Sequence, residues 1–138
     1  MNLAADNIRI LSAAMVEKAH SGHPGGAMGG ADFINVLFSE FMIYDPSDPQ
    51  WKCRDRFFLD PGHMSPMLYS QLALCGKYTL DELKSFRQWG SITPGHPERD
   101  VERGIENTSG PLGQGHTYAV GAAIAAKAWL LVLAMNLS

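Results

Sequence analysis

Apolar residues in the first half of the chain recur mainly at the three- and four-residue steps of an α-helix. Residues 3–20 predict one helix, in which Ile8, Leu11 and Met15 would share the buried face. Residues 31–41 predict a second helix from the same spacing. The run at 21–26 is rich in Gly and Pro, so we expect it to end the first helix.

The second half of the chain predicts three more helices and one long loop. A helix is predicted over 65–75, and Gly76 suits its C-terminal cap. Residues 79–82 match a capping box, which should start a short helix through residue 88. Residues 90–115 predict an irregular segment of a length that is usually functional or disordered. A last helix, rich in Ala and Gly, is predicted over 117–131.

One strand is predicted, at residues 56–59. A lone strand leaves its backbone groups without partners. Either further strands lie in the loops, or the chain lacks the part that completes its sheet. The predicted elements are mostly helical, with few short strands. The apolar tail at 130–133 could extend the last helix or pair with 57–59, and if neither buries it, it forms a partner or aggregation surface.

Composition narrows the classes of function. The chain has 138 residues, enough for one domain, and 46% are hydrophobic. A net charge of -3 gives no electrostatic footprint for nucleic acid or an anionic membrane. The longest apolar stretch falls short of the roughly 18 residues of a membrane span, and no signal peptide is apparent. We expect a cytoplasmic protein in which Cys53 and Cys75 are buried free thiols, with one disulfide between them as the alternative.

The histidines are the first candidate for chemistry. Four of the five directly follow glycine: His23, His63, His96 and His116. Glycine lets the backbone approach a ligand, and imidazole can bind oxygen atoms or move protons near neutral pH. Ordinary loop histidines remain the alternative for each one singly. A zinc site is a weaker alternative, because no metal-binding spacing occurs.

A glycine-rich loop at 110–115 is the second candidate. Its G-x-x-G-x-G spacing differs from both the dinucleotide and the Walker fingerprints. The spacing alone indicates a tight backbone loop that enters a helix, and a purely structural turn is an equal alternative. Glu98, Asp100, Glu102 and Glu106 alternate with arginines, which predicts a solvated loop of mixed charge.

Taken in order, these motifs resemble the N-terminal part of transketolase. The matching segments are residues 18–26, 54–59, 62–63, 68–70, 86–88, 93–98, 108–115 and 119–121. The resemblance covers about 3–128 of a domain that we place at 1–138, and 129–138 diverges. Several motifs in one order are more specific than any one of them.

The resemblance implies an α/β fold, present here as a partial thiamine diphosphate-binding fold that is predominantly helical with few short strands. It also implies an enzyme of carbohydrate metabolism, in the pentose phosphate pathway. Such an enzyme transfers a two-carbon ketol unit between sugar phosphates and uses thiamine diphosphate. It implies that His23 and His96 are catalytic and substrate-binding residues. It also implies that His63 contacts the cofactor diphosphate, and that Gly110, Pro111 and Leu112 contact its aminopyrimidine. Sugar phosphates would be the substrates, and the partner a second copy or a complementing transketolase chain.

The chain departs from the family pattern in three respects. Pro61 stands where Asn is common, and His116 where many members have an apolar residue. No Gly-Asp-Gly occurs, so ligands for Mg or Ca are absent from the chain. We therefore expect little or no turnover by the chain alone. The alternative function is a non-catalytic association module, or an inactive truncated product that keeps the front half of the fold.

Overall fold

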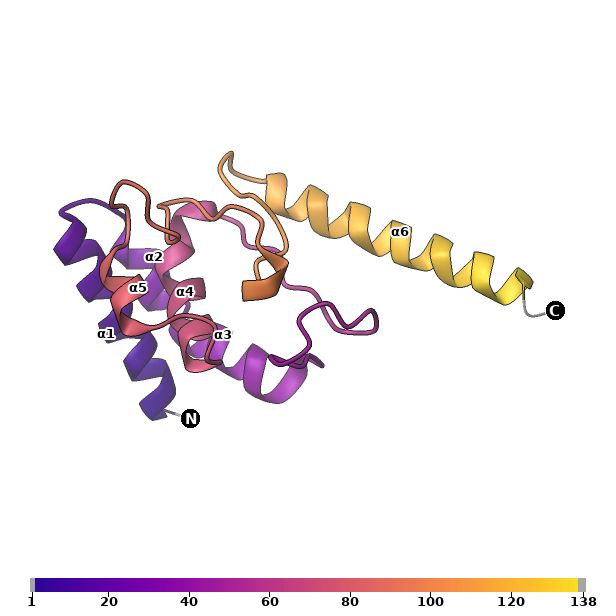
Figure 1. Cartoon of the computed structure of the whole chain (residues 1–138), viewed down its shortest axis with the longest axis horizontal. Coiled ribbons are helices and arrows are strands. Elements are labelled where there is room, and N and C mark those ends of the chain that lie inside the picture. Colours follow the sequence, from indigo (N-terminus) through magenta and orange to yellow (C-terminus); the bar gives the residue numbers. More distant parts are fainter. Residues whose placement is uncertain (1, 137–138) are drawn as a thin grey trace.

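The computed structural model describes residues 2–136, which form a helical body and one projecting helix (Figure 1). The α-helices of this part are α1 (Asn2–Ala19), α2 (Pro24–Gly29), α3 (Ala31–Val36), α4 (Ser65–Leu74), α5 (Leu80–Lys84) and α6 (Gln114–Asn136). Shorter turns are the π-helix η1 (Leu37–Phe41) and the 3-10 helices η2 (Gly62–Met64) and η3 (Val101–Arg103).

Helix α4 lies at the centre of the body and packs on α1, α2 and α3. Its residues from Ser65 to Leu72 are all buried. Such all-round burial explains why α4 carries no polar stripe, unlike a surface helix. The core around it consists of Ala5, Ile8, Met15, Ala27, Ala31, Ile34, Phe38, Leu59, Met67, Leu68, Tyr69, Leu72, Tyr78, Leu83, Phe86 and Ile105.

The helices predicted at 3–20, 31–41 and 65–75 are confirmed, with the second ending as η1. The prediction that 21–26 is only a break was incomplete, because α2 begins at Pro24. Proline suits the first helical position, since its missing N–H would have no partner there. The capping box of Thr79 and Glu82 is present, but α5 ends at Lys84 rather than at residue 88.

The strand predicted at 56–59 is wrong. The described residues contain no strand, only an antiparallel bridge between Asp100 and Ile105. Side chains from a distant loop replace the missing neighbour strand. The Leu59 N–H donates to Asn107 Oδ1 at 3.1 Å, and the Leu59 carbonyl accepts from Asn107 Nδ2 at 3.3 Å and Ser109 Oγ at 2.9 Å. The segment therefore satisfies its buried backbone without a sheet.

Two smaller expectations also fail. Cys53 is exposed rather than buried, because it lies in the polar loop before the extended segment. Cys75 is a half-buried free thiol whose Sγ lies 3.0 Å from Tyr44 Oη. Glu106 is not part of a solvated loop: its carboxylate pairs with Arg54, and both side chains are under 10% exposed, at 8% and 9%. That ion pair ties the segment before Leu59 to the segment after Ile105.

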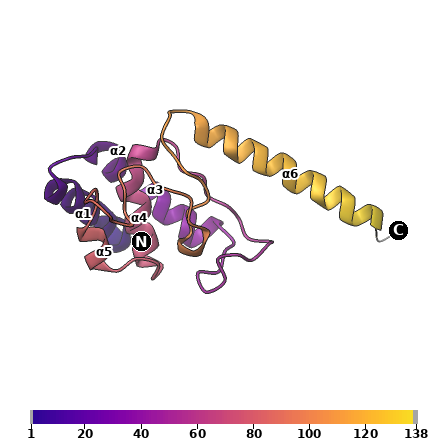
Figure 2. The same cartoon turned by 45° about the horizontal axis from the view of Figure 1, so that its top comes forward.

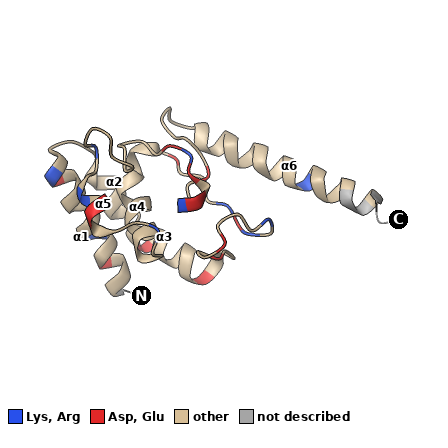
Figure 3. Ribbon diagram, in the orientation of Figure 1, with Lys and Arg blue, Asp and Glu red and all other residues tan. Residues whose placement is uncertain are grey.

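Helix α6 leaves the body and runs alone in both views (Figures 1 and 2). It is longer than the predicted 117–131, and residues 130–132 extend it instead of pairing with 57–59. It carries one charged residue, Lys127 (Figure 3). Its exposed large apolar side chains are Tyr118, Val120, Ile124, Trp129, Leu130, Leu131, Val132 and Met135. Within residues 2–136, no helix is both long and apolar enough to cross a membrane.

Candidate functional site

Three of the glycine-flanked histidines meet near the N-terminal end of α4. His23 lies directly before α2, and His63 lies in η2, directly before α4. Their ring centroids are 4.6 Å apart. His96 comes from the long loop, and its ring packs against Gly62, where an added Cβ would lie 3.0 Å from Cδ2. Three segments that are distant in sequence thus bring three imidazoles together.

Helix α4 holds the backbone of the His96 loop in place. Ser65 Oγ donates to the Gly95 carbonyl at 2.7 Å, and Tyr69 Oη donates to the Pro94 carbonyl at 2.9 Å. Both donors are on buried residues. Because buried hydrogen bonds are costly to break, these contacts fix the position of His96 relative to His63.

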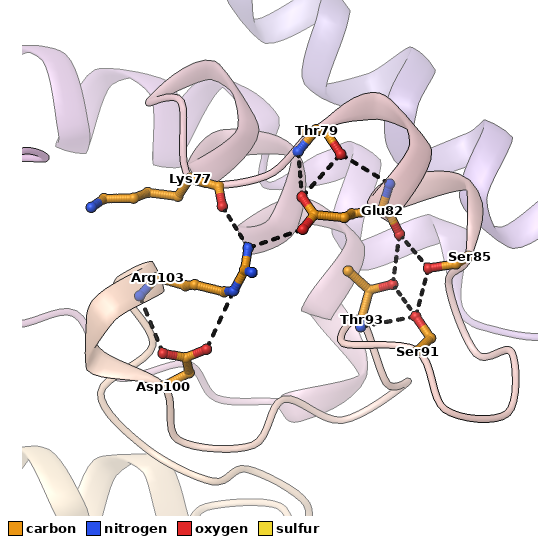
Figure 4. Close-up of polar contacts among 8 residues, drawn as sticks. All are labelled: Lys77, Thr79, Glu82, Ser85, Ser91, Thr93, Asp100 and Arg103. Atoms are coloured by element: carbon orange, nitrogen blue, oxygen red, sulfur yellow. Dashed lines mark hydrogen bonds and ion pairs between the residues drawn. The ribbon is translucent and has the colours of Figure 1, made fainter.

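Helix α5 also contacts this loop, through Glu82 (Figure 4). Thr93 lies before His96 in the chain, and its Oγ1 donates to the Glu82 carbonyl at 3.0 Å. Arg103, after His96, pairs with the Glu82 carboxylate at 3.3 Å and with Asp100 at 3.5 Å. Glu82 therefore contacts the loop on both sides of His96. The pKa of Glu82 lies below its ordinary value, chiefly because the Thr79 N–H donates to its carboxylate.

The histidine cluster affects its own ionisation. The pKa of His63 is lowered, chiefly because desolvation disfavours the imidazolium, and then because His23 and His96 would add like charge. Asp60 acts in the opposite direction with less effect. This shift favours the neutral form of His63, which has one ring N–H to donate and one ring nitrogen to accept.

The glycine-rich loop begins beside His63. Ser109 packs against Gly62, where an added Cβ would lie 2.7 Å from Ser109 Oγ. A Cβ on Gly110 would meet nothing within 4 Å, and Pro111 and Leu112 are exposed. This loop therefore presents open backbone next to the cluster, as a segment that contacts a ligand must. His116 lies apart from the three clustered histidines, within α6.

Arg87 joins two of the histidine loops and was not singled out from the sequence. Its Nη1 donates to Ser21 Oγ at 2.7 Å, two residues before His23. Its guanidinium also packs on Gly95, where an added Cβ would lie 2.8 Å from Cζ. With Ser21 and His96 it lines an open, polar pocket. Only the fold reveals this role, because Ser21 lies 66 residues away from Arg87 in the sequence.

No metal site accompanies the cluster in the part of the chain that the structure describes. Within residues 2–136, no three His, Cys, Asp or Glu side chains are arranged to hold a metal ion. The histidines and the open loop offer hydrogen-bonding groups and backbone, which suit one side of an organic cofactor. They do not offer the oxygen ligands that would hold a magnesium diphosphate.

Comparison with known proteins identifies the class of this domain. The family model described as "Transketolase, thiamine diphosphate binding domain" matches residues 1–134. A transketolase of Halalkalibacterium halodurans is 53% identical over 126 residues, which are 91% of this chain and 19% of the relative. Transketolase 2 of Escherichia coli is 54% identical over 124 residues, with 89% and 19% covered. The chain belongs to the transketolase family and spans about a fifth of the length of these relatives.

Solved structures agree with the sequence comparisons. Transketolase from Leishmania mexicana superimposes with a TM-score of 0.84 at 51% identity, covering 88% of this chain and 18% of that one. A Pichia stipitis transketolase, solved as a complex with sedoheptulose-7-phosphate, gives 0.80 at 44% identity, with 88% and 18% covered. The chain is therefore a mostly helical portion of a thiamine diphosphate-binding fold, as the sequence predicts.

Proposed function

We propose that this chain supplies the histidine-lined part of a thiamine diphosphate site in an enzyme that transfers a two-carbon ketol unit between sugar phosphates. The observation that carries the proposal is the meeting of His23, His63 and His96 beside the open loop at 110–112. Family membership and the sugar phosphate bound to the Pichia stipitis relative support the same substrate class. When bound, thiamine diphosphate stabilises the carbanion on the carbon that is transferred.

Each residue has a proposed role. His23 and His96 bind substrate and hold or move protons on its hydroxyl and carbonyl oxygens, as imidazoles do near neutral pH. Neutral His63 donates its ring N–H to the cofactor diphosphate. Backbone groups of Gly110, Pro111 and Leu112 face the aminopyrimidine. The hydrogen bonds to α4 and α5 keep the His96 loop in position before any ligand arrives.

The isolated chain should bind this cofactor weakly and turn over little or no substrate. A diphosphate needs a divalent cation, Mg or Ca, to offset its charge, and the described residues present no cluster that could hold one. Isothermal titration of the chain with thiamine diphosphate and magnesium tests this point. Tight, metal-dependent binding by the chain alone would contradict it.

The surface of α6 supports a proposal about partners. Eight large apolar side chains are exposed on α6, and an exposed apolar surface of this kind marks a site of contact with another protein. We propose that a second copy of this chain or a complementing transketolase chain covers it. Ile124→Glu should shift the chain toward a monomer in light scattering after gel filtration, whereas Lys52→Glu, at an exposed position outside α6, should not. Equal masses for both variants and the unmodified chain would argue against the proposal.

The catalytic roles can be tested in a chimera, in which this chain's aligned residues replace the corresponding 124 residues of Escherichia coli transketolase 2. His23→Ala and His96→Ala should each lower kcat by about 10²-fold or more, the usual contribution of a general acid or base. The control is His20→Asn, because His20 has φ +47°, a conformation that Asn tolerates. An unchanged kcat in both alanine variants would refute these roles.

A further inference from the structure

The carboxylate of Asp60 contacts the start of α6 and the residue just before it. Its side chain is 7% exposed, and each oxygen has a separate partner. Oδ1 accepts the Gly113 N–H at 3.2 Å, and Oδ2 lies 2.8 Å from His116 Nδ1. A buried carboxylate is costly unless donors compensate it. Both oxygens are thus used by the segment that leads from the glycine-rich loop into α6.

The backbone next to Asp60 approaches the same segment closely. A Cβ on Gly115 would lie 2.7 Å from the Leu59 carbonyl oxygen and would overlap the Asp60 side chain. Real Cβ atoms do not come that close to backbone, so this contact requires glycine. The Asp60 clamp therefore consists of three contacts: with Gly113, with Gly115 and with His116.

The place of Asp60 in the chain gives the clamp its significance. Asp60 is three residues before His63, and Gly113 directly follows the loop at 110–112. One side chain thus joins the two segments proposed to face the cofactor. We propose that Asp60 is a positioning residue, which holds the loop at 110–112 at the correct distance from His63. His116 supports it. The proposal rests on the proposed function.

The two partners should differ in importance. The His116 side chain is 82% exposed, and ion pairs with such exposed groups contribute little. The Gly113 N–H, in contrast, is a backbone donor to this carboxylate, and the Asp60 side chain is only 7% exposed. Asp60→Ala should therefore disturb the position of the loop at 110–112 strongly, and His116→Asn only slightly. Asp60→Asn keeps an acceptor, so its effect on the loop should lie between these two.

Amide hydrogen exchange of the full chain tests the clamp without any cofactor. Asp60→Ala should speed exchange at residues 113–116 by about tenfold, the order expected for a lost hydrogen bond to a charged group. Exchange in α4 should stay the same. The matched control is Asp81→Asn, which removes a carboxylate that is 89% exposed. Unchanged exchange at 113–116, or an equal rise throughout the chain, would overturn the proposal.

Cofactor titration of the chimera tests the positioning role. Asp60→Ala should raise the Kd for thiamine diphosphate by about tenfold, while kcat at saturating cofactor stays within about twofold. Asp60→Asn should recover part of the affinity for thiamine diphosphate. Such a recovery would show that the loss in Asp60→Ala does not come from a failure to fold. A Kd that does not change, with the unmodified chimera binding normally, would overturn the role of Asp60. If the unmodified chimera binds no cofactor, the proposed function fails, and the exchange result is judged separately.

Discussion

Replacing Asn107 with alanine should destabilise the chain by about 1–3 kcal/mol, the cost of leaving a buried N–H without an acceptor. Leu59 is 2% exposed, so water cannot replace the lost Asn107 Oδ1. The Leu59 carbonyl keeps Ser109 Oγ as a donor at 2.9 Å. The penalty therefore comes mainly from the amide N–H.

Ser109→Ala should destabilise the chain less than Asn107→Ala and so provides a comparison. The Leu59 carbonyl then keeps Asn107 Nδ2 as a donor, so the loss should be only about 0.5–1.5 kcal/mol, the net worth of one hydrogen bond. In the double variant the carbonyl loses both donors. Its destabilisation should exceed the sum of the two single values by about 0.5 kcal/mol or more, because the residues share one partner.

Urea unfolding followed by circular dichroism at 222 nm measures these differences. Ser47→Ala is the control, because Ser47 is exposed and bonds only within its own turn, to Asp45. The reasoning is refuted if Asn107→Ala costs no more than Ser47→Ala. It is also refuted if the single effects of Asn107→Ala and Ser109→Ala simply add.

Two further predictions concern pH and glycine. The folded state should lose stability as the pH falls below about 6.5, because the unfolded chain takes up a proton on His63 before the folded chain does. Urea unfolding at pH 7.5 and 5.5 should show a smaller pH effect for His63→Asn, and an identical effect would contradict the assignment. Gly115→Ala should destabilise the chain through its clash with Leu59, whereas Gly121→Ala, with open space around it, should stabilise by about 0.5–1 kcal/mol. Equal effects in thermal unfolding would show that the clash does not exist.

Local patterns predicted the parts of the fold whose stability is local. The capping box at Thr79 and the apolar spacing of α1 depend on residues within a few positions of each other, and both are present. The prediction of a strand at 56–59 was wrong because the structure of this segment depends on a distant residue. Asn107 supplies what a neighbouring strand would supply, and nothing in an apolar run of four residues reveals that.

The candidate site shows the same division. Glycine next to histidine indicated that His23, His63 and His96 lie in loops, and the structure brings these three together. Arg87 and Asp60 were missed because Arg87 bonds to Ser21 and Asp60 to Gly113, each more than fifty residues away in the sequence. His116 shared the glycine pattern with the cluster and yet lies outside it. Local spacing cannot separate a ligand-facing histidine from one that pairs with a carboxylate.

The most direct test of the central claim is the binding of thiamine diphosphate to the chimera, measured by isothermal titration with and without magnesium. If this chain supplies the histidine-lined part of the site, the chimera should bind the cofactor in the presence of magnesium within about tenfold of the affinity of the intact relative, or about 1.4 kcal/mol. A chimera that is folded by circular dichroism and binds no cofactor with magnesium present would contradict the claim.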